Sequence, residues 1–268
     1  MKTRAAVLHE MGAKKPYKES KPLKIEYLEL DNPSEHEVLI KIHAAGLCHS
    51  DLSVINGNRP RPLPMALGHE ASGEVIKVGK AVTRVSEGDH VVCTFIPSCG
   101  KCIPCKEGRP ALCENGAISN EKGEMLEGGM RLSNDEGKVY HHLGISGFAE
   151  YSVVSENSIV KIDKKIPFER AAAFGCAIIT GIGAVVNTAQ IRSGSNVAVV
   201  GLGGIGLNAI IGAKLAGANE IIALDINEDK FELAKQFGAT ATFNSSDKDI
   251  DEQIKEYIPG GVEYRSEE

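Results

Sequence analysis

The first part of the chain alternates short apolar stretches with turn-forming residues, which is the pattern of β-strands joined by loops. Pro, Gly and Asn lie between the stretches and would end each strand. We therefore predict an all-β core whose loops carry the functional side chains, because function commonly lies on loops that a rigid scaffold holds. The predicted strands cover residues 5–8, 24–30, 38–42, 73–79 and 148–154.

Near Phe168 the spacing of apolar residues changes from that of strands to that of helices. Beyond it, apolar strands alternate with helical segments, an order that favours a parallel sheet covered by helices. We predict an α/β protein with a β domain over residues 1–177 and a doubly wound parallel-sheet domain over 178–268. The predicted helices are 168–174, 178–188, 228–238 and 249–257, with strands at 197–200, 221–225, 239–243 and from 262.

The composition is that of a soluble globular protein, with 42% apolar and 25% charged residues. No apolar stretch approaches the roughly 18 to 20 residues of a membrane-spanning helix, and the N-terminus lacks the plan of a signal peptide. The net charge of −6 comes without a concentrated basic stripe, so nothing favours nucleic-acid binding. We therefore expect a soluble, cytoplasmic protein without a nucleic-acid or membrane partner.

Seven cysteines in a chain without an export signal favour metal binding or catalysis over disulfides. Four of them lie close together at about 95–115, where glycines and a proline let the backbone fold back so that four sulfurs can reach one ion. We predict a closed structural zinc site. An iron–sulfur cluster and disulfides are weaker alternatives, because the last gap exceeds the ferredoxin spacing and no oxidising compartment is indicated. The four candidate ligands are Cys99, Cys102, Cys105 and Cys113.

Two further cysteines and one histidine form the three-ligand set of an open catalytic zinc site, in which water or substrate takes the fourth position. Cys48 lies in the run Cys48-His49-Ser50-Asp51, His69 lies in Gly68-His69-Glu70, and Cys176 lies far downstream. The seventh cysteine, Cys93, lies in an apolar stretch, and we expect it to be a small buried side chain.

Residues 118–147 are polar and glycine-rich, and His141 and His142 stand near their end. Adjacent histidines can indicate a metal site, but consecutive side chains of a strand point to opposite faces. We therefore expect a solvated loop that leads into the strand at 148–154.

A glycine-rich turn follows the strand at 197–200 and opens a helix of small residues. Gly201 allows the tight turn, Gly203 lets the backbone approach a pyrophosphate, and Gly206 allows close packing of helix and strand. The start of the helix attracts phosphate through its free N–H groups and its dipole. Asp225 ends the next strand, where its carboxylate would accept hydrogen bonds from ribose hydroxyls and repel a 2′-phosphate. The turn therefore predicts NAD rather than NADP.

Together these residues resemble the zinc-containing, medium-chain alcohol dehydrogenases, and the resemblance covers essentially the whole chain. It implies a GroES-like catalytic domain followed by an incomplete Rossmann domain. It also implies one catalytic and one structural Zn²⁺, NAD, and hydride transfer between NAD and a zinc-bound primary or aryl alcohol or aldehyde. Family members of full length are expected to form homo-oligomers. The matching segments are 48–51, 68–70, the four-cysteine lobe, 174–176 with 180–181, the glycine turn and 225–227.

The resemblance also implies individual roles at matching positions. Glu70 would be an outer or alternative ligand of the catalytic zinc, and Asp51 would orient His69. Ser50 would take the alcohol proton and pass it toward the nicotinamide ribose, while His49 would face the cofactor pyrophosphate. The implied catalytic zinc ligands are Cys48, His69 and Cys176, and the implied cofactor-binding residues are Thr180, Gly201, Gly203, Gly204, Gly206, Asp225 and Lys230.

Three features depart from the family pattern. In family members with a full proton relay, a histidine stands at the position that Ser53 occupies here. We therefore expect the last part of the relay, from the site to solvent, to run through water. The basic loop 56–62 replaces the acidic pair of the glutathione-dependent formaldehyde dehydrogenases, which disfavours that subclass. The chain also stops after one mononucleotide half and part of the next, so we expect a truncated form with slow or no turnover. Two alternatives stay open: an S-(hydroxymethyl)glutathione dehydrogenase and a non-catalytic zinc-binding remnant.

Overall fold

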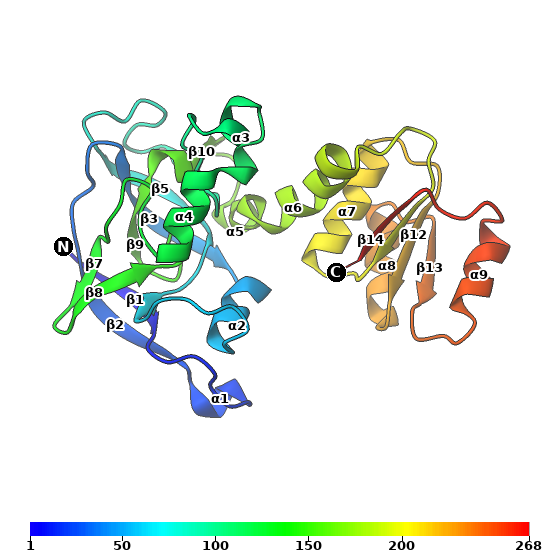
Figure 1. Ribbon diagram of the computed structural model, residues 1–268, viewed down its shortest axis with the longest axis horizontal. Helices are drawn as coiled ribbons and strands as arrows, with labels where there is room; N and C mark the ends of the chain where they lie inside the picture. The colour runs from blue at the N-terminus through cyan, green and yellow to red at the C-terminus, as the bar shows by residue number, and fades with distance from the viewer. Residues whose placement is uncertain (268) are drawn as a thin grey trace. The chain divides into compact units, whose positions relative to one another are not determined.

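The computed structural model describes residues 1–267, and the chain divides into two compact units (Figure 1). The first unit is Met1–Cys176, and the second begins at Ala177. The sequence-based boundary follows residue 177, whereas the division in the structure follows Cys176. Each unit has a hydrophobic core of its own, so each is described separately.

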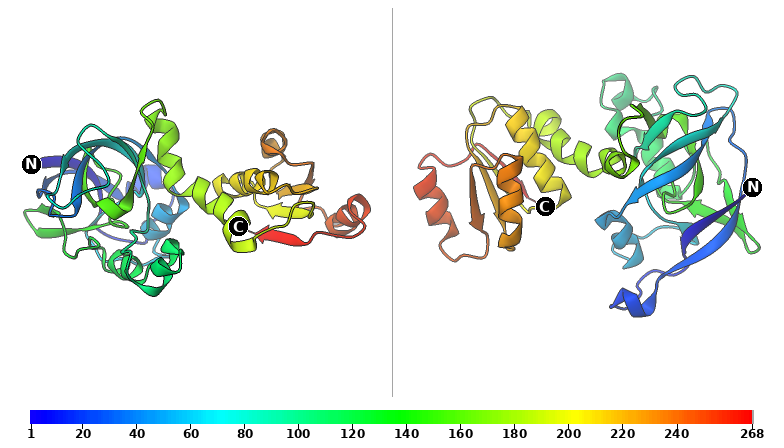
Figure 2. Two further views of the ribbon diagram at one scale, coloured as in Figure 1. Left: turned by 90° about the horizontal axis from the view of Figure 1, so that it is seen from above. Right: turned by 180° about the vertical axis from the view of Figure 1, so that it is seen from behind.

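β-Strands dominate the first unit and form two groups (Figures 1 and 2). One group closes into a small barrel, in the order β1 (Lys2–Leu8), β2 (Leu23–Leu30), β7 (Leu132–Asn134), β8 (Gly137–His141) and β4 (Met65–Ala66). The other is a five-stranded sheet, in the order β10 (Ile159–Ile162), β6 (His90–Cys93), β5 (Glu70–Val78), β3 (Glu37–Gly46) and β9 (Tyr151–Ser155). Neighbouring strands in the described part of this unit are antiparallel except β4 and β8, which are parallel.

All five strands expected in this unit form, although β9 begins at Tyr151 rather than at 148. The expectation of a loop over 118–147 is wrong, because this stretch contains the end of a helix and a strand pair, β7 and β8. The helix, α4 (Glu114–Lys122), starts where the Cys113 sulfur accepts a hydrogen bond from a backbone N–H of its first turn, and it ends at Gly123 in the left-handed conformation. Other short helices are α1 (Tyr17–Ser20), α2 (His49–Ile55), α3 (Ile103–Lys106) and α5 (Phe168–Ala171), with 3-10 turns η1 (Pro110–Leu112), η2 (Glu156–Ser158) and η3 (Ala172–Gly175).

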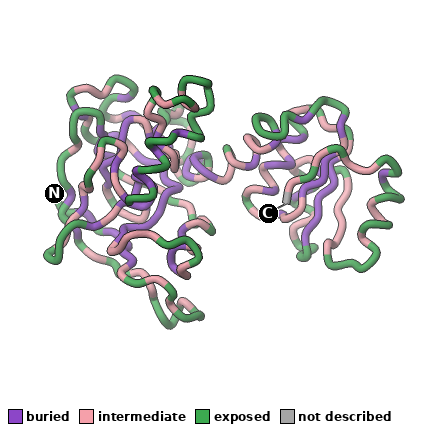
Figure 3. The backbone as a smooth tube through the Cα atoms, viewed as in Figure 1, coloured by how far each residue is buried: buried purple, intermediate pink, exposed green. Residues whose placement is uncertain are grey.

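Two main apolar layers fill the first unit, and Figure 3 shows their buried stretches in purple. One layer contains Val7 and Leu28 from the barrel. The other contains Ile40, Val91 and Val154 from the five-stranded sheet. Side chains alternate between the two sides of each strand, so one sheet can contribute to both layers.

A buried ion pair joins the sheet to the barrel. Glu37, the first residue of β3, is fully buried, and Arg131 directly precedes β7. The two carboxylate oxygens of Glu37 accept hydrogen bonds from Nε and Nη2 of Arg131 at 2.8 and 2.7 Å. The backbone N–H of Ser34 also donates to this carboxylate, at 2.9 Å. Such a two-point contact fixes orientation as well as distance.

The second unit is a parallel sheet with helices on both faces, which confirms the predicted α/β architecture. Val197 and Val199 pack into one layer, and the residue between them, Ala198, packs into the layer on the opposite face. The strand order is β13 (Ala241–Asn244), β12 (Ile221–Asp225), β11 (Val197–Val200) and β14 (Tyr264–Glu267). The helices are α6 (Ala177–Gly183), the π-helix η4 (Ala184–Ala189), α7 (Gly204–Leu215), the 3-10 turn η5 (Glu228–Lys230), α8 (Phe231–Phe237) and α9 (Ile250–Tyr257).

The helices in the described residues are short. No single one has both the length and the apolar composition needed to cross a membrane. Only the bent pair formed by 168–175 and 177–189 reaches that length and composition when its two parts are taken together.

We predict that Arg131→Met destabilises the first unit by about 3–5 kcal/mol, because it leaves the Glu37 carboxylate buried without its charge partner. Chemical denaturation followed by circular dichroism measures this loss. The control is Lys138→Met, since Lys138 pairs with Asp31 on the surface and such pairs contribute about 0–1 kcal/mol. Equally small effects of the two substitutions would show that the buried pair does not stabilise the unit.

Candidate active site

The expected zinc ligands Cys48, His69 and Cys176 lie outside helices and strands, which confirms the expectation that the ligand candidates fall on loops. The three candidate residues that follow Cys48 lie on helix α2. Cys48 is the N-cap residue of α2, between the end of β3 and the first helical turn. Asp51 in that turn accepts a hydrogen bond from the backbone N–H of Cys48 at 3.3 Å. A carboxylate at this position also faces the positive end of the helix dipole. His49 is exposed and Ser50 is half-buried. The N-cap and the first turn of α2 therefore carry all four candidate residues of this segment.

Four potential metal-ligand side chains meet in the first unit although they lie far apart in the sequence. One ligand atom from each of Cys48, His69, Glu70 and Cys176 lies within 4.8 Å of the others. His69 and Glu70 stand where β5 begins, and Cys176 follows the 3-10 turn η3. The structure therefore brings together the three residues expected to bind a catalytic metal and the residue expected to be an alternative ligand.

The position of Cys176 depends on the glycine before it. A Cβ atom built on Gly175 would lie 1.7 Å from the carbonyl oxygen of Cys93, so only glycine lets this segment approach β6 so closely. Cys93 itself is fully buried, which confirms the expectation for this residue. Burial raises the pKa of its thiol to about 12, and Cys93 is therefore a packing residue.

The electrostatics of the four-residue group favour a cation. Hydrogen bonding by Cys176 and then His69 lowers the pKa of the Cys48 thiol to about 3, whereas the hydrogen bond with Cys48 raises the pKa of Cys176. Burial disfavours charge on His69, but its contacts with Asp51 and Cys48 raise its pKa to about 9. Burial also raises the pKa of Glu70. Two sulfurs and a carboxylate this close together can all ionise only beside a positive ion.

The buried carboxylate of Asp51 connects the segments that carry these ligands. Its Oδ1 accepts a hydrogen bond from the backbone N–H of Gly68 at 3.1 Å and lies 3.2 Å from Nδ1 of His69. Burial opposes its charge, but contacts with His142 and His69 hold the pKa of Asp51 below its usual range. A histidine that binds metal through one ring nitrogen is oriented by such a partner at the other.

His141 and His142 are both buried, so the expectation of a solvated loop is wrong at these positions. His141 ends β8, where its Nε2 accepts a hydrogen bond from the backbone N–H of Arg131 at 3.0 Å, and burial lowers its pKa to about 3. His142 lies with its Nδ1 3.0 Å from Oδ1 of Asp51, and burial lowers its pKa too. Sequence analysis missed His142 as a neighbour of the site, and the only available signal was the histidine pair itself.

Ser50 lies in the first turn of α2, directly after Cys48 and His49. Its side chain lies close enough to the Cys48 sulfur for a hydrogen bond that contributes to the low pKa of that thiol. A hydroxyl beside a metal-ligand atom can reach a molecule bound at the open metal position and exchange a proton with it. Ser50 is therefore the candidate proton carrier.

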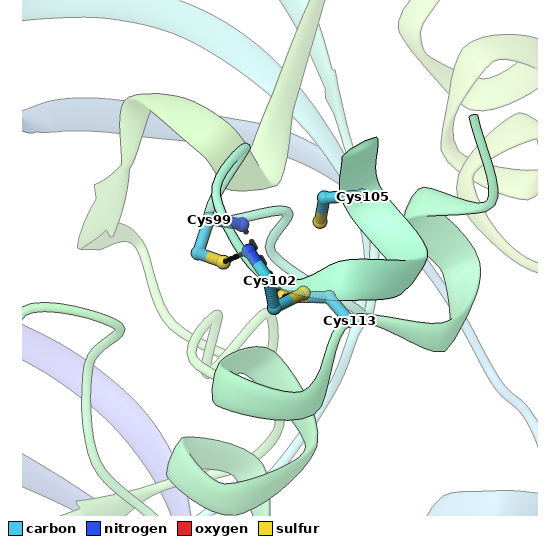
Figure 4. A group of neighbouring side chains, drawn as sticks. All are labelled: Cys99, Cys102, Cys105 and Cys113. Atoms are coloured by element: carbon cyan, nitrogen blue, oxygen red, sulfur yellow. Dashed lines mark hydrogen bonds between the residues drawn. The ribbon is translucent and has the colours of Figure 1, made fainter. Parts of the chain in front are cut away.

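The four cysteines expected to form a closed site converge in a separate lobe of the first unit (Figure 4). Their sulfurs lie within 4.8 Å of one another, which leaves room for one ion but not for a cluster of several irons. The Sγ atoms of Cys102 and Cys113 are 3.8 Å apart. This distance equals the edge of a sulfur tetrahedron whose corners lie about 2.3 Å from its centre, the usual Zn–S distance. Cys99 and Cys105 complete the set.

The charges of this lobe also favour a cation. Backbone N–H groups, led by that of Lys101, lower the pKa of Cys99 to about 6. Desolvation, together with the neighbouring sulfur of Cys102, raises the pKa of Cys105 to about 12. All the cysteines of the described chain are free, so no disulfide competes for these sulfurs. Both donor sets therefore fit zinc: a closed set of four thiolates, and an open set of two thiolates and an imidazole.

The glycine turn of the second unit joins β11 to α7, as the sequence predicts. Gly201 has a φ of +91°, and a Cβ atom on Gly206 would lie 1.8 Å from the carbonyl oxygen of Gly201. Gly203 is the N-cap residue of α7, and Gly204 is its first residue. The free N–H groups at this helix start can bind a phosphate group without interference from side chains.

Asp225 lies at the end of β12, next to this turn. Its buried carboxylate accepts hydrogen bonds from the N–H groups of Leu202 and Asn227 at 2.7 and 2.9 Å and from Nζ of Lys230 at 2.8 Å. Burial opposes its charge, but these donors lower the pKa of Asp225, which therefore stays ionised. A fixed negative charge here suits ribose hydroxyls and not a 2′-phosphate. Thr180, the remaining candidate, is half-buried on α6.

Comparison with known sequence families gives two matches. Residues 34–164 match the alcohol dehydrogenase GroES-like domain, and residues 204–267 match the zinc-binding dehydrogenase domain. Among curated proteins, the chain is similar to the S-(hydroxymethyl)glutathione dehydrogenase of Synechocystis sp.. The two are 44% identical, and the match covers 100% of this chain and 71% of the relative.

Solved structures with the same architecture include two dehydrogenases. One is the alcohol dehydrogenase zinc-binding domain protein from Burkholderia ambifaria, with a TM-score of 0.90 and 38% identity. The other is the benzyl alcohol dehydrogenase from Acinetobacter calcoaceticus, with a TM-score of 0.89 and 39% identity. Each match covers 99% of this chain and 70% of the other chain.

We predict two tightly bound zinc ions per chain, one in each donor set. Cys102→Ser and Cys176→Ser should each lower the zinc content to one ion, because each removes a thiolate from a different set. Cys93→Ser should leave two, since Cys93 belongs to neither set. Inductively coupled plasma mass spectrometry of the dialysed protein measures the content. An unchanged content after either of the first two substitutions would contradict the assignment of that cysteine.

Proposed function

Because the chain belongs to the zinc-dependent, medium-chain alcohol dehydrogenase family, we propose that it transfers a hydride between a primary or aryl alcohol, or the matching aldehyde, and NAD. The observation that carries the proposal is the convergence of Cys48, His69 and Cys176 in one group beside the Ser50 hydroxyl. Three protein ligands leave a position open for the oxygen of a substrate. The family uses zinc and NAD and acts on small alcohols and aldehydes, and the choice among them is the finer part of the proposal.

Each residue of the site has a proposed task. Cys48, His69 and Cys176 would hold the zinc ion, which when bound lowers the pKa of a coordinated hydroxyl, while NAD accepts the hydride. Asp51 keeps the His69 ring in one orientation through its Nδ1. Ser50 accepts the proton of the alcohol and passes it on. Its position beside the Cys48 sulfur supports this task.

The cofactor preference rests on the second unit. The ionised carboxylate of Asp225 beside the glycine turn supports NAD, because it would accept hydrogen bonds from the adenosine ribose and repel the extra phosphate of NADP. Lys230 neutralises part of this charge at 2.8 Å, so we propose that it helps to set the strength of the preference. His49 and Thr180 remain candidates for contact with the cofactor.

A second candidate function is oxidation of S-(hydroxymethyl)glutathione. The similarity to the Synechocystis sp. enzyme of that name favours it. The basic loop at 56–62 weighs against it by resemblance, since that subclass has an acidic pair there. A third candidate is a zinc-binding protein without catalysis, for which two bound zinc ions without NAD binding would be diagnostic.

The remaining expectations concern the setting of the protein. Both donor sets need reduced thiols, which supports a reducing compartment, and we propose the cytoplasm. We also propose a homo-oligomer, by analogy with the full-length family. Sedimentation velocity of the purified chain would measure its oligomeric state.

We predict that the purified chain forms NADH only slowly from NAD and benzyl alcohol or ethanol in the absence of glutathione, as the sequence leads us to expect, and that a zinc chelator abolishes the reaction. Ser50→Ala should lower kcat by about 100- to 10,000-fold, the usual contribution of a positioned proton-transfer group. The matched control is Ser53→Ala on the same helix, which should leave kcat nearly unchanged. Spectrophotometry of NADH formation measures the rates.

Three results would contradict this proposal in different ways. Turnover that requires formaldehyde and glutathione together would favour the second candidate. Two bound zinc ions without NAD binding would favour the third. If Ser50→Ala keeps the kcat of Ser53→Ala and of the unmutated chain, Ser50 is not part of the proton path, although the reaction itself stays in place.

We predict that Asp225→Asn weakens NAD binding by about tenfold or more and narrows the difference between NAD and NADP, because a hydrogen bond to a charged acceptor contributes about 1.5–3 kcal/mol. The matched control is Asp229→Asn, which removes an exposed carboxylate from the 3-10 turn η5 that follows β12. Isothermal titration calorimetry with each cofactor measures the affinities. Identical NAD affinities for the two variants would contradict the role of Asp225.

A further inference from the structure

The carboxylate of Asp51 has more donors around it than the metal site alone explains. Oδ2 receives the backbone N–H of Cys48, and Oδ1 receives that of Gly68 and faces Nδ1 of His69. These three contacts come from the two segments that carry Cys48 and His69. A fourth contact comes from a third segment, because Nδ1 of His142 lies 3.0 Å from the same Oδ1.

The ring of His142 is held in place by its surroundings. The residue is 1% exposed, and its backbone N–H donates to the carbonyl oxygen of Ala66 at 3.2 Å. Its own carbonyl oxygen accepts the N–H groups of Ile145 and Ser146 at 3.1 and 3.2 Å. Its ring packs edge-on against that of His69, with centroids 5.4 Å apart and an interplanar angle of 86°.

The polar neighbour of the Nδ1 atom of His142 is the carboxylate of Asp51. The approach of Nδ1 to Asp51 is short without being aligned as an ideal hydrogen bond, and no other polar atom among the described residues satisfies Nδ1. A buried polar nitrogen without a partner is costly, so the contact with Asp51 is the one that accounts for a histidine at this position. An apolar side chain would fill the same volume without this cost.

We propose that His142 is a positioning residue of the metal site: its Nδ1 completes the donors around Asp51, and the edge of its ring closes one side of the His69 imidazole. Asp51 is thereby fixed between His142 and His69. The other ring nitrogen of His69, Nε2, then stays directed toward Cys48 and Cys176. This inference rests on the proposed metal site. It adds to that site a residue that touches neither metal nor substrate.

Two substitutions separate the donor from the bulk of the side chain. In His142→Asn the amide nitrogen can take the place of Nδ1, whereas in His142→Gln it reaches the place of Nε2. Cobalt(II) is titrated into protein from which the catalytic metal has been removed, and its visible absorption bands report both affinity and ligand geometry. We expect His142→Gln to weaken cobalt binding by about 10- to 100-fold, and His142→Asn to stay within about threefold of the unmutated chain.

The matched control is His141→Gln. His141 is equally buried and adjacent in sequence, but its ring nitrogens contact the backbone N–H of Arg131 and the hydroxyl of Ser146 and not Asp51. It should leave cobalt binding and the absorption bands unchanged. Thermal melting and the zinc content of the four-cysteine lobe report whether each variant is folded.

The outcomes distinguish the inference from the proposed function. Unchanged cobalt affinity in His142→Gln, an equal loss in His142→Asn, or an equal loss in His141→Gln would overturn the role of His142. Failure of the unmutated chain to bind cobalt outside the four-cysteine lobe would overturn the proposed catalytic site itself.

A measurement without substitution covers the case in which the variants do not fold. Nitrogen-15 NMR of the histidine rings identifies which nitrogen carries the proton. We expect the proton of His142 on Nδ1, facing Asp51. A proton on Nε2 alone would overturn the proposal.

Discussion

The ligand group of the first unit depends on the buried carboxylate of Asp51. Removing a carboxylate from water is costly unless donors replace the lost hydration, and here the donors are main-chain and ring N–H groups of the segments that carry Cys48 and His69. Satisfying this one side chain therefore fixes the path of the backbone at both segments. The geometry of the ligand group therefore depends on the backbone path at these two segments as well as on the side chains that the group contains.

Local patterns in the sequence predict much of the fold and several parts of the candidate sites. Five strands of the first unit and the strands of the second follow from apolar periodicity, and the glycine turn with Asp225 is recognisable because strand, turn, helix and strand follow one another directly in the chain. The four cysteines of the lobe are likewise close in sequence. Cys48, His69 and Cys176 are not, and it was their chemistry as a ligand set that linked them before any coordinates did.

What sequence analysis missed has physical causes. α2 and α4 both begin at a cysteine, Cys48 and Cys113, which is not among the residues that usually mark a helix start, so the signal for either helix was absent. The burial of His141 and His142 depends on partners from elsewhere in the fold, Arg131 and Asp51. No periodicity within 118–147 could reveal those partners, because an imidazole is buried only where a distant group satisfies its nitrogens.

The four-cysteine lobe differs from the rest of the first unit in what orders it. None of residues 98–112 is buried, and Ile103 and Leu112 are 65% and 59% exposed. A stretch without apolar burial has little to offset the conformational entropy lost on folding, so coordination bonds must take the place of a core. The folding of this lobe therefore depends on zinc concentration more than on temperature. In a cell without available zinc, the sheets would fold while the lobe stayed disordered.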